Sequence, residues 1–208
     1  MLTLYFARAT ISLATHILLE EVGATYATQR IDFAKTEQRS PEYLKVNPKG
    51  RLPALITDRG ILTETPAMLV YVAQQFGRPD LALMDDAFAF AEVQAINAWL
   101  CSSLHINHAH RMRGTRWVDA NDGVAIAAMQ RHVPVSVSAN YELIEDKMLK
   151  GPWLMGERYT VCDPYLFTLA QWLEQDGVDA KKIPRVIDHR RRVAERAATR
   201  KAIAQECA

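Results

Sequence analysis

The stretch Asn47-Pro48-Lys49-Gly50-Arg51-Leu52-Pro53-Ala54-Leu55 separates helical patterns from a predicted β-hairpin in the first third of the chain. Asn, Pro and Gly close together interrupt regular structure, so residues 47–50 predict a turn. The run from Pro53 to Thr57 then predicts a strand. Proline fits the first position of such a strand, because it has no backbone N–H to donate to a neighbouring strand.

A returning strand and a helix follow. Asp58-Arg59-Gly60 predicts the hairpin turn, and residues 61–64 predict the second strand of the hairpin. A helix is predicted from Thr65 to Phe76, because Pro66 occupies its first turn and Gly77 stands just past its end.

The segment before the quoted stretch predicts two more strands and two more helices. Leu2 to Phe6 and Thr25 to Ile31 predict the strands, and Ser40 to Val46 a short helix. Between the two strands, an apolar stripe closed by Gly23 predicts a longer helix. The stripe consists of Ile11, Ala14, Ile17, Leu18 and Val22. The order β-α-β-α-β-β-α predicts a small α/β layer with a mixed sheet.

Beyond Gly77 the patterns are helical only, so we predict two domains. Residues 1–77 form the α/β domain, 78–85 a linker and 86–208 an all-helical domain. Helices are predicted over residues 86–112, 122–150, 163–175 and 184–204, the second of them bent at Pro134.

The composition is typical of a soluble globular protein, with 208 residues, 49% hydrophobic and 24% charged, and a formal net charge of +1. Near-neutrality weakens the case for nucleic acid or anionic lipid as a partner. Cys101, Cys162 and Cys207 stand far apart, outside any disulfide or zinc-ligand pattern. The longest uncharged run, Val93 to His110, is too polar for a membrane span. We expect a cytoplasmic protein that contacts no membrane.

Three motifs taken together point to a known family. They are the 47–55 stretch, Glu64-Thr65-Pro66-Ala67, and Tyr159-Thr160-Val161-Cys162-Asp163. With them, the whole chain resembles the cytosolic glutathione transferases, in which a thioredoxin-like α/β domain precedes an all-α domain. Ser12-Leu13-Ala14-Thr15-His16-Ile17 and Ser103-Leu104-His105 make it most similar to the bacterial beta-class and beta-like members. In this family Thr160 and Asp163 form a capping box at the start of a buried helix.

The resemblance implies that glutathione, as co-substrate, binds along residues 51–65. It implies a cis bond between Leu52 and Pro53, which presents the Leu52 backbone to the cysteinyl part of the tripeptide; a trans proline at an edge strand is the alternative. Glu64 and Thr65 stand at a predicted helix N-terminus, which favours a carboxylate, while the Glu64 side chain can hold an ammonium. Glutathione's γ-glutamyl end has both groups. The alternative is that these two residues only cap the helix.

The glycyl carboxylate at the other end of glutathione needs a cation. Lys35 matches a residue that serves this role in beta-class relatives, and Lys49 and Arg51 are further candidates. A solvated surface charge is the alternative for each of them.

The thiol-activating position departs from the beta-class pattern. Relatives of that class have a cysteine where this chain has Ile11, so a mixed disulfide at that position is not available. Three donors remain: Ser12 in the first helix, Tyr5 in the first strand and His105 in the second domain. An ordinary helix-start serine, a core tyrosine and a histidine bonded between helices are the alternatives.

The electrophile pocket is predicted beside residues 108–117, with His108, Arg113 and Trp117 as contacts. The arginines there could bind an anionic substrate, or lie at a solvated helix end. Geometry argues against a zinc site of His105, His108 and His110, because His110 points away from His108 on a helix. Nine basic residues between 181 and 201 predict a solvated terminal helix; no aromatic residues interleave them, which argues against nucleic-acid binding.

The resemblance therefore predicts a homodimeric glutathione transferase that activates the thiol for attack on a small electrophile between the domains. Two alternatives stay open. One is a glutathione-binding or ligand-carrying dimeric module that has lost its chemistry together with the cysteine. The other is a glutathione-dependent isomerase or dehalogenase, which would use the same thiolate.

Overall fold

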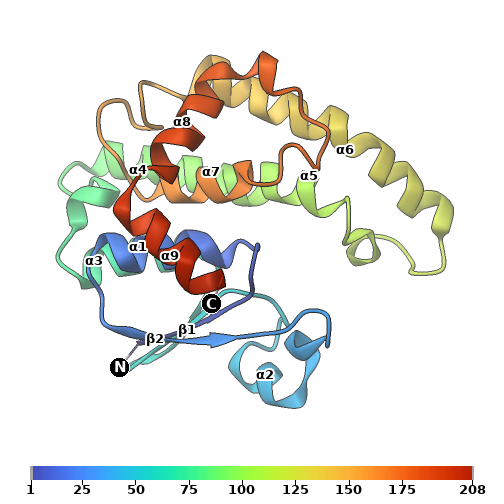
Figure 1. The fold of residues 1–208 in the computed structure, drawn as a ribbon, viewed down its shortest axis with the longest axis horizontal. Helices are drawn as coiled ribbons and strands as arrows, with labels where there is room; N and C mark the ends of the chain where they lie inside the picture. Colours follow the sequence, from blue (N-terminus) through green and yellow to red (C-terminus); the bar gives the residue numbers. More distant parts are fainter. Residues whose placement is uncertain (1, 208) are drawn as a thin grey trace.

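A computed structural model describes residues 2–207, and Figure 1 shows a sheet layer below a larger helical part. The sheet layer consists of β1 Leu2–Phe6, α1 Ser12–Glu21, β2 Tyr26–Arg30, α2 Pro41–Val46, β3 Ala54–Thr57, β4 Gly60–Thr63 and α3 Thr65–Gln75, with a 3-10 turn at Glu37–Arg39. The predicted order β-α-β-α-β-β-α is confirmed.

The four strands form one mixed sheet in the order β2-β1-β3-β4. β1 runs parallel to β2 and antiparallel to β3, so Leu4 lies opposite Thr28 on one side and Leu55 on the other. Leu4 and Leu55 are fully buried in a core that includes residues of α1 and α3. The side chains of a strand alternate between the two faces, so the apolar positions of β1 all reach this core.

Helix α1 is buried on both sides. Most of the predicted stripe packs in the core shared with the sheet, but Ile17 packs on the other side of the helix. Leu13, Thr15, His16 and Leu19 are buried as well. Leu13 packs in a cluster that includes residues of α7, α8 and α9. Figure 1 shows why: α1 lies between the sheet and the helices above it.

The helical part confirms the predicted all-α character. Its helices are α4 Ala87–Trp99, α5 His105–Ala109, α6 Gly123–Leu143, α7 Cys162–Ala170, α8 Pro184–Ala194 and α9 Ala197–Cys207. A π-helical turn at Leu100–Leu104 joins α4 to α5, and another at Ile144–Met148 extends α6, which contains Pro134. The domain boundaries stay predictions, and the predicted linker contains a 3-10 turn at Pro79–Ala82. No helix within residues 2–207 is long and apolar enough to cross a membrane.

The prediction of one terminal helix over residues 184–204 was wrong. α8 and α9 are separated at Glu195 and Arg196. At this break Arg196 pairs with Glu21 of α1 and lies 3.8 Å from the centre of the Tyr159 ring. The chain turns there because α9 packs on α1, a contact that the local sequence does not reveal.

The predicted capping box at the start of α7 is confirmed and is more extensive than expected. The fully buried carboxylate of Asp163 accepts the Thr160 N–H at 2.6 Å and the Leu154 N–H at 2.9 Å. His189 Nε2 of α8 lies 3.0 Å from the same carboxylate. One side chain thus joins the loop before α7 to α8.

Asp163→Asn is expected to lower the free energy of unfolding by about 1–3 kcal/mol, because an amide NH₂ would face buried donors that now have an acceptor. Urea unfolding measures this loss. The matched control is Asp188→Asn, at an exposed carboxylate paired with Arg191 and Arg192, where a change below about 1 kcal/mol is expected. Equal losses in the two variants would contradict the assignment.

Candidate functional site

The loop between α2 and β3 is held by its own polar groups. The Tyr43 hydroxyl and the Asn47 side-chain amide both donate to the Arg51 carbonyl, each at 2.7 Å. Gly50 has a φ of +59°, and a Cβ there would lie 3.0 Å from the Gln38 carbonyl oxygen. Glycine is therefore required for the loop to take this path.

This loop leads into an open backbone edge. The Leu52–Pro53 peptide bond is cis, as the resemblance predicted. Within the described chain, neither the N–H nor the C=O of Leu52 bonds to another backbone group. A peptide ligand can pair with that edge as an added antiparallel strand.

Glu64 and Thr65 lie where β4 passes into α3. Glu64 has a φ of +71°, a left-handed backbone that is costly for a residue with a side chain. Its carboxylate does not cap the helix; Lys49 Nζ lies 2.5 Å from Glu64 Oε1 and 2.6 Å from Thr63 Oγ1. Thr65 is buried at the first position of α3, where free helical N–H groups attract a carboxylate.

Of the three predicted cations for the glycyl carboxylate, Lys49 pairs with Glu64, and the other two lie in different surroundings. The Lys35 side chain is 74% exposed, and its ammonium is 3.7 Å from Asp32. The Arg51 side chain is also exposed, but its charge acts on His105 of the helical part. Arg51 therefore lies toward the other predicted site residues. Within residues 2–207, the Lys35 ammonium pairs with Asp32 and with none of those residues.

The loop between β1 and α1 contains two hydroxyl groups in contact. Thr10 Oγ1 lies 2.7 Å from Ser12 Oγ, and both are within 3.1 Å of the Ala7 carbonyl oxygen. Ser12 is fully buried, whereas Thr10 is half-buried. Ile11, at the beta-class cysteine position, packs in the core. Of the two hydroxyls, Thr10 is thus the one nearer the surface, and the sequence prediction had omitted it.

Trp172, after α7, connects this loop to the helical part. Its indole N–H donates to the Ala9 carbonyl at 3.3 Å. The His108 ring stacks on the indole with centroids 4.0 Å apart, and His108 Nδ1 lies 2.7 Å from the buried Asp176 carboxylate. The His105 ring is 5.8 Å from the same indole. Trp172 therefore places His105 next to the loop that holds Thr10.

His105 is neutral in its surroundings. Burial first, then the charges of His108, Arg116 and Arg51, lower the pKa of His105 to about 4. A neutral imidazole can accept a proton or donate a hydrogen bond at physiological pH.

The remaining predicted residues lie around the same region. Tyr5 is half-buried, with its ring centre 5.7 Å from that of Tyr43. The Arg113 guanidinium lies 5.5 Å from the centre of the Phe33 ring, so the segment after α5 reaches the sheet layer. Trp117 is 42% exposed.

The sequence analysis omitted Thr10 and Trp172, and it considered Arg116 only as one of the arginines of the segment 108–117. A hydroxyl two positions before Ser12 was a signal for Thr10. For Trp172 the sequence contains no signal, because its partner Ala9 is 163 positions away.

The rest of the described chain offers weaker candidates for a ligand site. Two surface hollows of about 530 and 230 Å³ lie elsewhere, and three of the arginines that line them, Arg78, Arg192 and Arg196, are already paired with carboxylates. Within residues 2–207 no three His, Cys, Asp or Glu side chains are placed to hold a metal ion. The residues between the sheet layer and the helical part therefore form the candidate site.

Comparison with known proteins identifies the family. Residues 1–74 match the model of the glutathione S-transferase N-terminal domain. A crystal structure of a glutathione transferase homologue from Sulfitobacter, with bound glutathione, is 39% identical, has a TM-score of 0.94, and the match covers 99% of this chain and 98% of that one. The chain therefore belongs to the glutathione transferase family.

Two relatives over nearly the whole chain are named for different reactions. Glutathione S-transferase GstA of Escherichia coli O157:H7 is 25% identical, over 98% of each chain. Maleylacetoacetate isomerase of Pseudomonas aeruginosa is 29% identical, over 96% of this chain and 92% of its own.

The neutral state of His105 predicts how stability depends on pH. The folded pKa of about 4 is below the unfolded value of about 6.5, so as pH falls through this window only the unfolded chain takes up the proton and stability falls. Between pH 7 and pH 5 the loss should be smaller in His105→Gln, by up to about 2 kcal/mol. Urea unfolding at the two pH values tests this, and an unchanged loss would contradict it.

Proposed function

We propose that this protein activates the thiol of glutathione for attack on a small electrophile between the sheet layer and the helical part. The proposal rests mainly on the position and pairing of Glu64. Its carboxylate stands on a left-handed backbone at the N-terminus of α3 and already pairs with an ammonium, that of Lys49. The γ-glutamyl ammonium is the same chemical group, and its carboxylate suits the adjacent N–H groups of α3.

With the γ-glutamyl end at Glu64, the other two residues of glutathione can be placed. The cysteinyl backbone pairs with the free edge of Leu52, next to Pro53. The glycyl carboxylate then lies toward a cation, for which Arg51 is better placed than the exposed Lys35.

The thiol is activated by a chain of hydroxyl groups. The Ala7 N–H donates to Ser12 Oγ at 3.3 Å, and Ser12 Oγ lies 2.7 Å from Thr10 Oγ1. When a thiolate is present, Ser12 donates to Thr10, and the Thr10 hydrogen turns from the Ala7 carbonyl to the sulfur. Hydrogen bonds in such a chain strengthen one another. Tyr5 and the neutral His105 remain as further donors from the strand and the helical part.

We also propose that the protein is a homodimer in the cytoplasm. Phe88, near the start of α4, is 75% exposed, and aromatic side chains are enriched at interfaces, so it suits a face covered by a second copy. The carrier alternative differs from the enzyme only in whether the bound thiol is activated, so the thiol pKa separates them.

Glu64→Gln is expected to weaken glutathione binding by roughly 10- to 150-fold, because it removes a charge-assisted bond worth about 1.5–3 kcal/mol. Calorimetric titration measures the affinity, and melting curves check that the fold survives. Lys49→Gln is the matched control: it removes the competing ammonium and should not weaken binding. Equal affinities of wild type and Glu64→Gln, or no binding by wild type, would contradict the site.

Thr10→Val is expected to raise the pKa of the bound thiol by roughly one to two units and to lower turnover more than affinity, because it removes the donor to sulfur. Ser12→Ala should act in the same direction, and Thr10→Ser should retain the wild-type values. An ultraviolet difference spectrum of bound glutathione against pH reports the thiolate. If only His105→Ala raised the thiol pKa and lowered turnover, His105 would be the donor that stabilises the thiolate. An ordinary thiol pKa in the wild-type protein would indicate a carrier.

A further inference from the structure

Four arginines from three separate segments gather beside the candidate site. Arg39 ends the 3-10 turn before α2, Arg51 precedes Leu52, and Arg113 and Arg116 follow α5. In Figure 1, α2 and the segment after α5 lie on the same side of the molecule. Partial burial, together with the charges of Arg51, Arg113 and Arg39, lowers the pKa of Arg116 to about 10, so all four charges act on one region.

Contacts with the protein hold two of these side chains at the boundary between the sheet layer and the helical part. Arg113 lies over the Phe33 ring, which follows β2. Arg39 lies against Gly50, where an added Cβ would be 3.2 Å from Arg39 Nη1. The cluster also faces His105, because the charges of Arg51 and Arg116 act on that ring.

No carboxylate neutralises this cluster within residues 2–207. Elsewhere in the chain arginines do find such partners: Arg111 lies 2.9 Å from Asp176, and Arg190 lies 2.7 Å from Glu174. Like charges that lie close together without a partner repel each other, so a bound anion would relieve that repulsion.

Glutathione alone does not account for four guanidinium groups. In the proposed function one of its carboxylates lies at the N-terminus of α3, beside Glu64. The other needs one cation, because a single guanidinium binds a carboxylate through two parallel hydrogen bonds. With Arg51 in that role, three remain: Arg39 in the sheet layer, and Arg113 and Arg116 in the helical part.

The segment that contains these two arginines also exposes apolar surface. Met112 is 67% exposed, and Trp117 is 42% exposed, with the His110 ring packed edge-on at 4.5 Å. We propose that Arg113 and Arg116 bind a carboxylate of the second substrate, so that the preferred electrophiles are organic anions with an apolar body. This inference rests on the proposed function, because the second substrate is the molecule that the glutathione sulfur attacks.

Two electrophiles that differ in one charge test the inference: chlorodinitrobenzene, which is neutral, and chlorodinitrobenzoate, which has a carboxylate. The reaction is the same for both. The sulfur forms a bond to the ring carbon, chloride leaves with the bonding electrons, and the thiol proton passes to solvent. The measured quantity is kcat/KM for the anion divided by kcat/KM for the neutral compound, at saturating glutathione.

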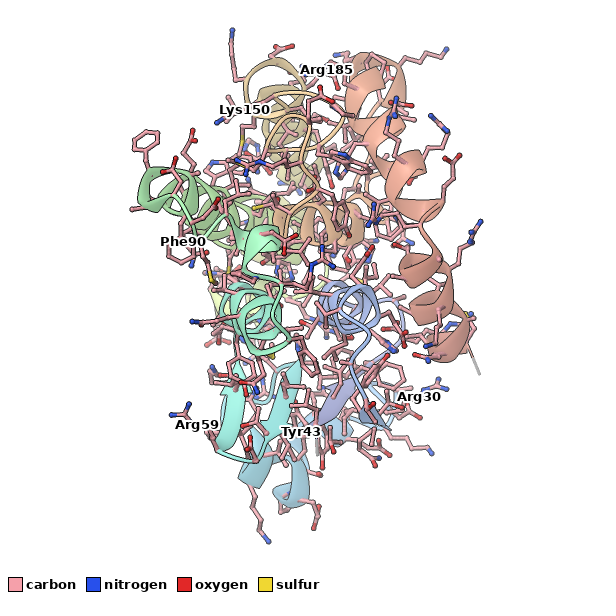
Figure 2. All side chains as sticks on the ribbon, turned by 90° about the vertical axis from the view of Figure 1, so that its left-hand side faces the viewer. Arg30, Tyr43, Arg59, Phe90, Lys150 and Arg185 are labelled. Carbon is pink, nitrogen blue, oxygen red and sulfur yellow. The ribbon has the colours of Figure 1, made fainter. Side chains whose placement is uncertain are left out.

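Arg116→Gln and Arg113→Gln are each expected to lower this ratio by roughly 10- to 150-fold, the effect of one lost charge-assisted bond. Arg59→Gln is the matched control, because Arg59 is an exposed arginine in the β3–β4 turn, at the outer edge of the sheet layer in Figure 2. It should leave both values unchanged. An unchanged ratio in Arg116→Gln and Arg113→Gln, or a change only in the KM for glutathione, would overturn the inference while the proposed function stands.

A binding measurement without catalysis distinguishes failure of the anion site from failure of the proposed function. Dinitrobenzoate lacks chlorine and does not react, so it can be titrated into the protein without glutathione while NMR follows the His105 ring. Its negative charge should raise the pKa of His105 in wild type and have a much smaller effect in Arg116→Gln. If dinitrobenzoate binds in this way but neither electrophile is conjugated, the anion site stands and the proposed function fails; if the pKa does not move and the ratio is unchanged, the anion site fails.

Discussion

Helix α1 has no solvent-facing side over Ser12 to Leu19, because the sheet covers one side and α7, α8 and α9 cover the other. A helix packed in this way cannot shift without opening cavities in two cores. The loop from Ala7 to Ile11, at its N-terminal end, therefore has a fixed position relative to the helical part. The bond from Trp172 to the Ala9 carbonyl uses that fixed position, and the His105 ring lies 5.8 Å from the same indole.

The charges around the site are unevenly distributed. At the γ-glutamyl end, the one carboxylate of Glu64 is neutralised by Lys49. Toward the helical part, Arg51 and Arg116 have no acidic partner among the described residues, and His105 is held neutral beside them. In the proposed function this positive field has two effects, since it favours a thiolate over a thiol and attracts an anionic substrate to the same place.

The basic C-terminal segment shows how the same residue type behaves where partners exist. Arg190 pairs with Glu174, Arg196 with Glu21, and Lys201 with Glu20 of α1. These ion pairs hold the last two helices against the rest of the fold. Only the surroundings in the folded chain distinguish these arginines from the four at the candidate site, since nothing in the sequence does.

The sequence by itself determined the element order, the mixed sheet, the turn before Pro53 and the helix start at Thr65, because strand alternation, turn residues and caps act over a few neighbouring positions. The proposed glutathione end of the site also rests on contiguous motifs, which local sequence can reveal. The tertiary structure alone decided that Ser12 is buried behind Thr10, that Lys49 pairs with Glu64, that the last helix breaks at Glu195, and that four arginines meet without an acid. Each of these depends on which distant segments pack together, and local patterns contain no information about that packing.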